Sequence, residues 1–180
     1  LMHARRAVEL TPADPGAIAD LGRHHLLLRQ YAGARETLDQ ALALDSTRAE
    51  TRGLLGLLAE ELGDHELAES HYRAALASAP DDAEALASLG RIHALDGRTD
   101  EARVVLAQLD SLAPRRYVSP YLFATIAEAL GDRRRAFAWL EEAVEDRAGD
   151  VVWLDLDPRL DRLRGDHRFA RIRRSAGLPA

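Results

Sequence analysis

The sequence predicts an all-α fold built from stacked helical hairpins, and two observations carry this prediction. Ala (33 residues) and Leu (30 residues) supply more than a third of the 180 residues, whereas aromatic residues make up only 5%. Ala and Leu are among the strongest helix formers. Small residues also recur every 34 positions, at Ala34, Ala68, Ala102 and Ala136. A fixed period of this length is typical of repeat architectures, in which each unit packs on its neighbours.

The first helix of each unit is predicted by a stripe of apolar and small residues. Ile18, Leu21, Gly22 and His25 stand at i, i+3, i+4 and i+7, which places them on one face of a helix. A Gly inside a helix costs about 1 kcal/mol relative to Ala, so its periodic return indicates a packing role. The same stripe recurs at Leu86, Leu89, Gly90 and His93.

The second helix of each unit carries the facing stripe, which begins at Ala34 and continues through Leu38 and Ala41. The small side chains of Gly22 and Ala34 are expected to let the two backbones approach closely. Matching stripes occur one and two periods later, at Ala68, Tyr72 and Ala75 and at Ala102, Leu106 and Leu109.

Capping residues mark the predicted helix ends. Asp14-Pro15 and Ser119-Pro120 each place a side-chain acceptor before a Pro that opens a helix. Thr47-x-x-Glu50 has the form of a capping box, and Gly63 stands where a left-handed residue would end a helix, as do Gly97 and Gly131. The predicted helices are 16–29, 33–44, 48–62, 65–78, 82–96, 99–112, 119–130 and 133–147, with short helices near 158–164 and 166–175.

The order of residues within each unit resembles the tetratricopeptide repeat, which reads W-x2-L-G-x2-Y, then A-x3-F, then P. The Leu-Gly pair stands at 21–22, 55–56 and 89–90, and becomes Phe-Ala at 123–124. The resemblance covers about residues 15–147 and implies a right-handed α-α superhelix. The chain departs from the family at the Tyr position, which holds His25, Ala59, His93 and Ala127.

The resemblance divides the chain into repeats and a cap. Residues 1–14 correspond to the second helix of an incomplete repeat, so the chain is expected to be a piece of a longer protein. The complete repeats are predicted at 15–48, 49–82, 83–116 and 117–150, of which the last is degenerate, and residues 151–180 form a C-terminal helical cap.

The last third of the chain carries a second resemblance. The segments YVSPY at 117–121 and DPRLDRLRGD at 157–166, followed by Phe169, are similar to the ending of repeat regions in bacterial multidomain regulators. In those proteins a winged-helix DNA-binding domain, a cyclase or a Ser/Thr kinase lies N-terminally. The ending usually has Pro where this chain has His167, although Asp166 still offers an N-cap. The resemblance implies a module that serves an effector rather than one with its own activity.

Both ends of a stack of hairpins expose apolar surface. At the C-terminal end a lid is expected, and burying each of its large side chains would stabilise the fold by about 1.5–3 kcal/mol. The half repeat at the N-terminal end leaves an open face, which predicts a possible homodimer. The predicted lid residues are Trp153, Leu160, Leu163, Phe169 and Ile172.

Composition and motifs argue against several kinds of chemistry. The chain has no Cys, which excludes disulfides, Cys-ligated zinc and thiol nucleophiles. None of the seven His residues forms an i, i+4 pair, and neighbouring carboxylates such as Glu60 and Glu61 face apart on a helix. Motifs of nucleophilic, phosphate-binding and dinucleotide-binding sites are absent. The sequence therefore predicts no enzyme, no cofactor and no metal.

Nucleic acid and membranes are also unlikely partners on the sequence. Residues 151–180 carry 7 Arg against 4 Asp, whereas residues 1–150 carry 17 Arg against 26 acidic residues. The clustered Arg168, Arg171, Arg173 and Arg174 could contact an acidic partner, but arginines near a helix C-terminus also complement its dipole. The second interpretation is favoured because the acidic remainder would repel phosphate. No apolar run approaches the roughly 18 residues of a membrane span, and a cytoplasmic protein is expected.

The remaining candidate site is a groove. The exposed face of each first helix would point into the concave surface that stacked hairpins create, although ordinary solvated surface is the alternative. The family's carboxylate clamp needs Lys and Asn, which this chain lacks. The expected function is therefore a non-catalytic scaffold that binds another protein segment, a peptide or a helix; the alternative is an intramolecular module packing on an N-terminal effector. The predicted groove residues are Arg23, Leu27, Leu57, Glu60, Arg91, Tyr121, Thr125 and Glu128.

Overall fold

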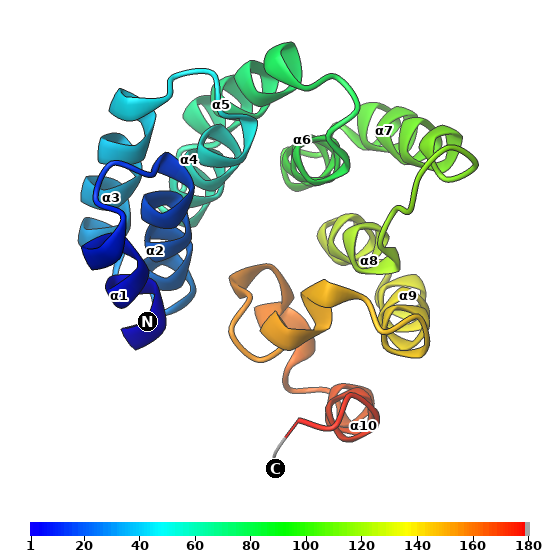
Figure 1. The fold of residues 1–180 in the computed structure, drawn as a ribbon. Helices are drawn as coiled ribbons and strands as arrows, with labels where there is room; N and C mark the ends of the chain where they lie inside the picture. Colours follow the sequence, from blue (N-terminus) through cyan, green and yellow to red (C-terminus); the bar gives the residue numbers. More distant parts are fainter. Residues whose placement is uncertain (179–180) are drawn as a thin grey trace. The chain divides into compact units, whose positions relative to one another are not determined.

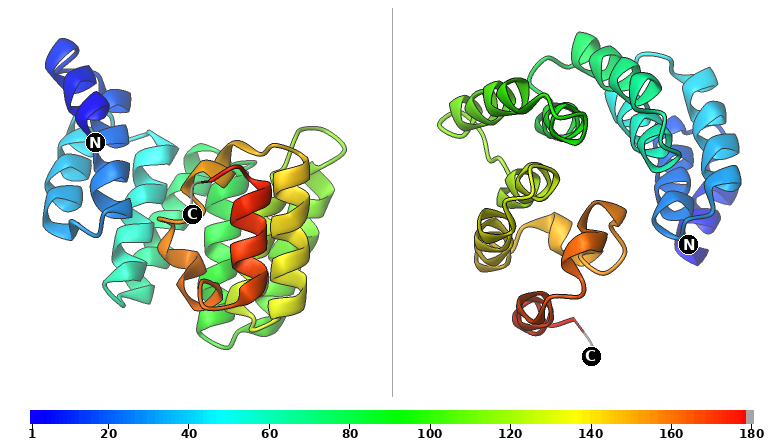
Figure 2. Two further views of the ribbon diagram at one scale, coloured as in Figure 1. Left: turned by 90° about the horizontal axis from the view of Figure 1, so that it is seen from below. Right: turned by 180° about the vertical axis from the view of Figure 1, so that it is seen from behind.

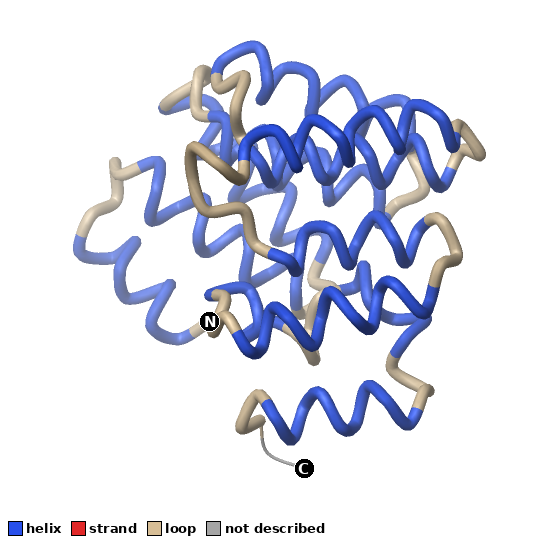
Figure 3. Tube along the Cα trace, turned by 90° about the vertical axis from the view of Figure 1, so that its right-hand side faces the viewer, coloured by secondary structure: helices blue, strands red, loops and turns tan. Residues whose placement is uncertain are grey.

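The computed structural model describes residues 1–178, and all regular secondary structure in that range is helical (Figures 1 and 3). The fold class predicted from the sequence is therefore confirmed: the chain consists of paired helices of the α-α solenoid type. The chain forms two compact units, of which the first spans Leu1–Ala85 and the second begins at Leu86.

The first unit contains two complete helical hairpins and one preceding helix. Helices α2 and α3 form the first hairpin, and α4 and α5 form the second, with α4 packed against both α2 and α3. The preceding helix α1 packs on α2 (Figure 1), and its assignment to an incomplete repeat stays a prediction. The bounds are α1 Met2–Leu10, α2 Pro15–Leu27, α3 Tyr31–Leu44, α4 Ala49–Glu61 and α5 His65–Ser78.

The second unit contains the remaining hairpins and the cap. Helices α8 and α9 form a hairpin, a 3-10 helix η2 packs on α8, and α10 lies alongside α9 (Figure 2). The bounds are α6 Ala83–Leu95, α7 Thr99–Leu112, α8 Pro120–Ala129, α9 Arg133–Glu145, η1 Gly149–Trp153, η2 Pro158–Leu163 and α10 His167–Ser175. Helix α6 thus begins just before the boundary between the two units.

Each predicted repeat helix is present, with its ends within two residues of the prediction. In the cap, the predicted helix near 158–164 is a 3-10 helix, and α10 begins at His167 because the Asp166 side chain accepts a hydrogen bond from the Arg168 backbone N–H at 3.0 Å. Leu160 and Leu163 are buried as predicted, as are Phe169 and Ile172. Trp153 is only partly buried. The boundaries between repeats stay predictions.

The predicted helix ends have their expected geometry, with one exception. Gly63 has φ +80°, and the Asp64 N–H donates to the Ala59 carbonyl at 2.9 Å, which is the Schellman arrangement. Gly97 and Gly131 are also left-handed. The capping box predicted at Thr47 is wrong, because the Thr47 hydroxyl donates to Asp45 at 2.7 Å and α4 begins one residue later.

The recurring mid-helix glycines lie where the two helices of a hairpin approach each other. A Cβ atom added to Gly22 would lie 2.6 Å from Leu38 Cδ2, and one added to Gly56 would lie 2.4 Å from Tyr72 Cε1. Both distances are shorter than a van der Waals contact. The close approach inferred from the 34-residue period is therefore real.

Candidate protein-interaction surface

In the first unit, a charged cluster lies on α2 and at the start of α4. The Arg23 guanidinium donates to Glu50 Oε1 at 2.9 Å, and Arg48 donates to Glu50 Oε2 at 2.7 Å. Partial burial raises the pKa of Glu50, but hydrogen bonds from Arg48 and Arg23 outweigh this effect and hold the pKa below its usual value. The cluster therefore contains two guanidinium groups and the ionised Glu50 carboxylate, and a second carboxylate, that of Asp20, lies 3.9 Å from Arg23 Nε, so its charges balance.

An open position on α4 adjoins this cluster. Glu50, Gly53 and Leu57 stand at i, i+3 and i+7, so they share one face of the helix. A Cβ atom added at Gly53 would meet nothing within 4 Å, which leaves room for another chain to approach the α4 backbone. Leu57, at the apolar end of this face, is 9% exposed and belongs to the hydrophobic core of the unit, so its role in partner binding stays a prediction. We call the set formed by Arg23, Arg48, Glu50 and Gly53 the α2–α4 surface.

Two further groove residues predicted in this unit, Leu27 and Glu60, are buried like Leu57. Leu27 is 8% exposed and Glu60 is 7% exposed. Glu60 accepts a hydrogen bond from the Tyr72 hydroxyl at 3.1 Å, which links α4 to α5. Both side chains contribute to packing, and their role in partner binding stays a prediction. Arg23 keeps more exposed side-chain surface, 24%.

In the second unit, the predicted groove residues are buried and engaged within the chain. Tyr121 and Thr125 are fully buried, and Glu128 and Arg91 are nearly so. The Thr125 hydroxyl donates to the Leu122 carbonyl at 2.8 Å, and Arg91 Nη2 lies 3.7 Å from Glu128 Oε2. These side chains line up on α8 and α6 as the sequence predicts, but they do not form an open surface there.

The C-terminal segment covers the face of α8 that carries Tyr121, Thr125 and Glu128. The Tyr121 hydroxyl donates to Asp157 Oδ2 at 2.9 Å, and Arg162 donates to the two Glu128 carboxylate oxygens at 2.5 and 3.0 Å. Leu160, between these two anchors in sequence, is fully buried. We call the face formed by Tyr121, Thr125 and Glu128 the inner face of α8, and residues 157–163 of the same chain cover it. Partner binding by Tyr121 and Glu128 stays a prediction.

Electrostatics favour this docked segment. Burial raises the pKa of Asp157, but the adjacent Arg159 guanidinium, at 2.7 Å, lowers it more, so the carboxyl is ionised. Burial and the nearby Asp157 charge raise the pKa of Tyr121 well above its ordinary value. Asp157, Arg159 and Arg162 were not predicted as site residues from the sequence. All three lie in the segment DPRLDRLRGD at 157–166, whose charged side chains were the available signal.

The arginine cluster of α10 is paired within the chain. Arg168 binds Asp166 at 2.7 Å and stands 4.1 Å over the centre of the Phe137 ring. Arg171 binds Glu141 at 2.5 Å, and Arg173 binds Asp155 at 2.8 Å. Three of the four arginines therefore already neutralise carboxylates of the cap and α9. This pairing supports a structural role for the cluster.

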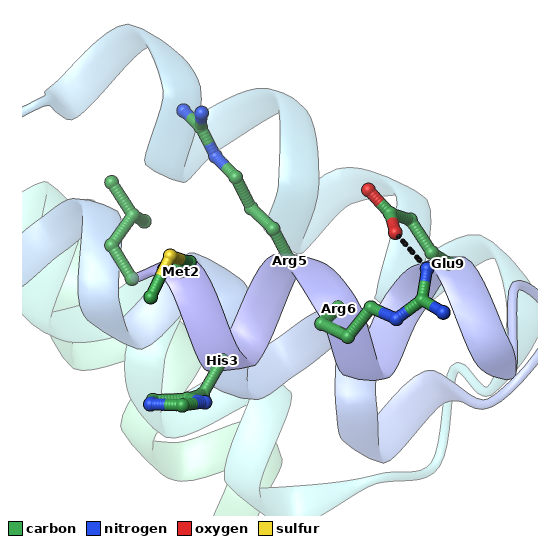
Figure 4. Close-up of a pocket in the computed structure, with 6 residues that line it drawn as sticks. Met2, His3, Arg5, Arg6 and Glu9 are labelled. Carbon is green, nitrogen blue, oxygen red and sulfur yellow. Dashed lines mark hydrogen bonds and ion pairs between the residues drawn. The ribbon is translucent and has the colours of Figure 1, made fainter.

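At the N-terminal end, a shallow hollow lies along α1 (Figure 4). Its lining contains both basic and acidic side chains, and Arg6 binds Glu9, one turn further along the same helix, at 2.7 Å. Met2 and Leu10 are largely exposed, which agrees with an open face at this end of the first unit. Association of two copies through this face stays a prediction.

Within residues 1–178, no three His, Asp or Glu side chains gather in a way that would hold a metal ion. None of the helices in the same range combines the length and the apolar composition needed to cross a bilayer.

Comparisons with known proteins agree with the repeat pattern. Residues 54–115 match the family model described as "Tetratricopeptide repeat". Human tetratricopeptide repeat protein 8 is 36% identical over 83 residues, which cover 46% of this chain and 15% of the human protein. The mouse protein of that name is 32% identical over 102 residues, which cover 55% of this chain and 20% of its own length. The chain thus spans a fifth or less of these relatives.

Two solved structures have folds similar to that of this chain. PilF of Pseudomonas aeruginosa has a TM-score of 0.56 at 21% identity, covering 91% of this chain and 75% of its own. PilW, a type IV pilus biogenesis factor, has a TM-score of 0.58 at 18% identity, covering 95% and 80%. At such identities the similarity concerns the fold alone.

Proposed function

We propose, from the match of residues 54–115 to the tetratricopeptide repeat model and from the paired helices, that this chain is a non-catalytic scaffold whose α2–α4 surface binds an extended segment or a helix of a protein partner. We place this scaffold within a larger cytoplasmic bacterial regulator. The observation that carries the proposal is the open position at Gly53 beside the Arg23–Glu50–Arg48 cluster. Stacked helical hairpins commonly use the face of their first helices for binding.

The composition of the α2–α4 surface indicates what the partner segment carries. Arg23 and Arg48 bind Glu50, and Asp20 lies near Arg23, so the charges of the cluster are balanced within the chain. The open space over Gly53 admits the partner's main chain, and the partly exposed guanidinium groups beside it can also hydrogen-bond to polar groups of that segment. An extended segment with polar groups beside the cluster fits these features.

A second candidate function is an intramolecular one, in which the repeats pack on an effector domain of the same polypeptide and bind no separate partner. The specific observation in its favour is the inner face of α8, which already holds residues 157–163 of its own chain. The same kind of contact could join the repeats to a neighbouring domain.

A capture experiment tests the first candidate. The chain is immobilised, and proteins retained from an extract of its source cells are quantified by mass spectrometry. Gly53→Trp fills the open space, and Arg23→Glu reverses one charge of the cluster. We expect each to reduce the retained partner at least about tenfold, equivalent to about 1.4 kcal/mol.

The matched control is Arg73→Glu on α5, whose side chain is exposed and binds only Glu69 one helical turn away. This variant should retain the partner at the wild-type level. Unchanged capture by both α2–α4 variants would refute binding at that surface. Capture of only the effector region of the same polypeptide would favour the intramolecular candidate.

A further inference from the structure

The inner face of α8 is occupied by a segment of the same chain, so the chemistry of an occupant that fits it is known. Asp157 accepts a hydrogen bond from the Tyr121 hydroxyl at 2.9 Å. Five residues later, Arg162 binds the two carboxylate oxygens of Glu128 at 2.5 and 3.0 Å. Leu160, between them, is fully buried. The occupant therefore has the order Asp-x-x-Leu-x-Arg.

The inner face of α8 is polar although it is buried. Tyr121 and Thr125 have no exposed surface, and Glu128 is 3% exposed. The other side of the helix is apolar, where Phe123 and Ala127 line a cavity shared with α7 and α9. Replacing a buried ion pair with apolar residues is often neutral or stabilising, so a face that only needed a cover would be served by apolar side chains. Its polar groups favour recognition of one particular segment.

Residues 157–163 are held on α8 by their side chains, while their backbone closes local turns. The Leu160 N–H donates to the Asp157 carbonyl at 3.1 Å, within the 3-10 helix η2. Arg162 keeps 58% of its side-chain surface exposed, so solvent reaches one side of its ion pair. Departure of the segment from the inner face therefore breaks side-chain contacts and leaves its own turns intact.

Helix α10, which follows the segment, has an attachment of its own. Arg171 of α10 binds Glu141 of α9 at 2.5 Å. Gly165 lies in the turn between η2 and α10, and a Cβ atom added there would meet nothing within 4 Å. Residues 157–163 can therefore leave the inner face while α10 stays on α9.

A segment of another protein with the same order of residues would remake each contact that residues 157–163 give up. Its Asp would accept the Tyr121 hydrogen bond, its Leu would take the place of Leu160, and its Arg would pair with Glu128. A segment that lacks one of these groups would leave a buried polar group unpaired, which is costly. The exchange is therefore close to balanced for a matching segment and unfavourable for others.

We propose that residues 157–163 are an intramolecular ligand that keeps the inner face of α8 closed, and that a protein partner with an Asp-x-x-Leu-x-Arg segment displaces them and binds in their place. A tethered segment has a high effective concentration at its site, so wild type binds a free segment weakly. Any change that loosens residues 157–163 raises the affinity. The site lies in the second unit and does not depend on the α2–α4 surface.

The first experiment measures binding of a free segment to the full chain. The probe is a fluorescein-labelled peptide with the sequence of residues 155–166, DLDPRLDRLRGD, and fluorescence anisotropy follows its binding. Arg162→Ala releases one anchor of the chain's own segment and should bind the peptide at least about tenfold more tightly than wild type, a difference of about 1.4 kcal/mol. The matched control Arg103→Ala removes a largely exposed arginine and should bind like wild type.

Changes in the peptide test the three contacts in the Arg162→Ala chain. Peptides with Asp157→Ala, Leu160→Ala or Arg162→Gln, and a scrambled peptide of the same composition, should each bind at least about tenfold more weakly than the parent peptide. Tyr121→Phe, added to the chain, removes the hydroxyl group that Asp157 accepts from. It should bring the affinities of the parent and Asp157→Ala peptides close together. This ratio does not depend on how far the chain's own segment has opened.

Several results would overturn the proposal. Equal binding by wild type and Arg162→Ala, or by the parent and scrambled peptides, would show that residues 157–163 are a permanent cap. Dimerisation of wild type in light scattering at the concentrations used would identify a second copy of this chain as the occupant instead. If Arg162→Ala fails to fold by circular dichroism, hydrogen exchange of wild type decides. The Leu160 amide should be less protected than the amides of α8, through local opening, and equal protection would reject the proposal.

Discussion

At the scale of single residues, Thr51 is a buried polar residue, and burying its hydroxyl group costs free energy of folding. Its side chain is fully buried, and its hydroxyl has no hydrogen-bond partner among the described residues. Thr125 is equally buried but donates to the Leu122 carbonyl. Two threonines of the same exposure therefore differ in a single interaction, which makes the cost of an unmade hydrogen bond measurable.

We predict that Thr51→Val raises the free energy of unfolding by about 1 kcal/mol, because the variant removes a desolvated hydroxyl without losing a partner. Urea unfolding followed by circular dichroism measures this change. The control Thr125→Val should lower stability or leave it unchanged. Equal stabilisation by both substitutions would show that the hydrogen bond of Thr125 has no net value.

Arg29 has a strained backbone conformation at a position where glycine stands 34 residues later. It has φ +57° and stands one period before Gly63, which has φ +80°. A left-handed conformation costs a residue with a Cβ atom roughly 1–2 kcal/mol, so Arg29→Gly is expected to stabilise the chain by about 1 kcal/mol. Arg29→Ala is the control, since it also removes the contact with Glu61 at 3.8 Å but keeps the strain. Thermal unfolding should separate the two variants.

At the scale of the helical element, the hairpins depend on glycine at one side of the helix and tolerate change at the other. A Cβ atom at Gly56 would collide with the Tyr72 ring, whereas one at Gly53, on the same helix, would meet nothing. We predict that Gly56→Ala destabilises the chain by about 1–3 kcal/mol through overpacking.

Gly53→Ala is the matched control for this prediction, because it makes the same substitution three residues earlier. It should stabilise α4 by about 0.5–1 kcal/mol, since Ala has less conformational entropy to lose than Gly. Chemical denaturation of both variants gives the comparison. A loss of similar size at both positions would mean that helix propensity, and not contact with Tyr72, governs the hairpin.

His71 on α5 makes stability depend on pH. Burial lowers the pKa of His71 from its ordinary value, Arg52 and Arg35 lower it further, and Asp39 opposes them. Because the pKa is lower in the folded state, the unfolded state binds more protons once the pH falls below about 6.5. Stability should therefore decrease as the pH falls from 7 toward 5.

His71→Gln is expected to make that decrease smaller, because Gln does not titrate. Urea unfolding at a series of pH values measures the slope for both proteins. A slope that is identical in the variant and in wild type would exclude His71 as its source.

At the scale of the whole molecule, the C-terminal segment closes the second unit through two long-range anchors. Glu128 is nearly buried and is held by Arg162, whose own side chain is 58% exposed. Removing this arginine leaves the buried carboxylate with Arg91, whose Nη2 lies 3.7 Å away. The Arg162–Glu128 ion pair therefore stabilises a carboxylate that is buried away from water.

We predict that Arg162→Ala lowers the free energy of unfolding by about 1–3 kcal/mol, because the buried Glu128 carboxylate loses the hydrogen bonds from Arg162 but keeps Arg91 nearby. Hydrogen exchange should accelerate in residues 157–163 and in α8, which that segment covers. The control Arg103→Ala removes an exposed pair and should change stability by less than about 1 kcal/mol. Unchanged exchange in residues 157–163 would show that the anchor does not hold the segment.

The sequence alone determined the helices of this protein, because their signals are local. The stripe around Gly22, the cap at Asp14 and the left-handed Gly63 act within a few residues, and the 34-residue period repeats them in register. The same periodic pattern predicted Arg23 as a groove residue, which lies on the α2–α4 surface, and Leu57, which is buried.

Only the tertiary structure decided which predicted surfaces are open. Tyr121 and Glu128 stand where the repeat pattern places them, but Asp157 and Arg162 reach them from 36 and 34 residues away. Whether a helix face meets solvent depends on the position of segments remote in sequence, which no periodic pattern within the repeats encodes. For the same reason the cavity between α7, α8 and α9, which needs three helices to form, could not be predicted from any one of them.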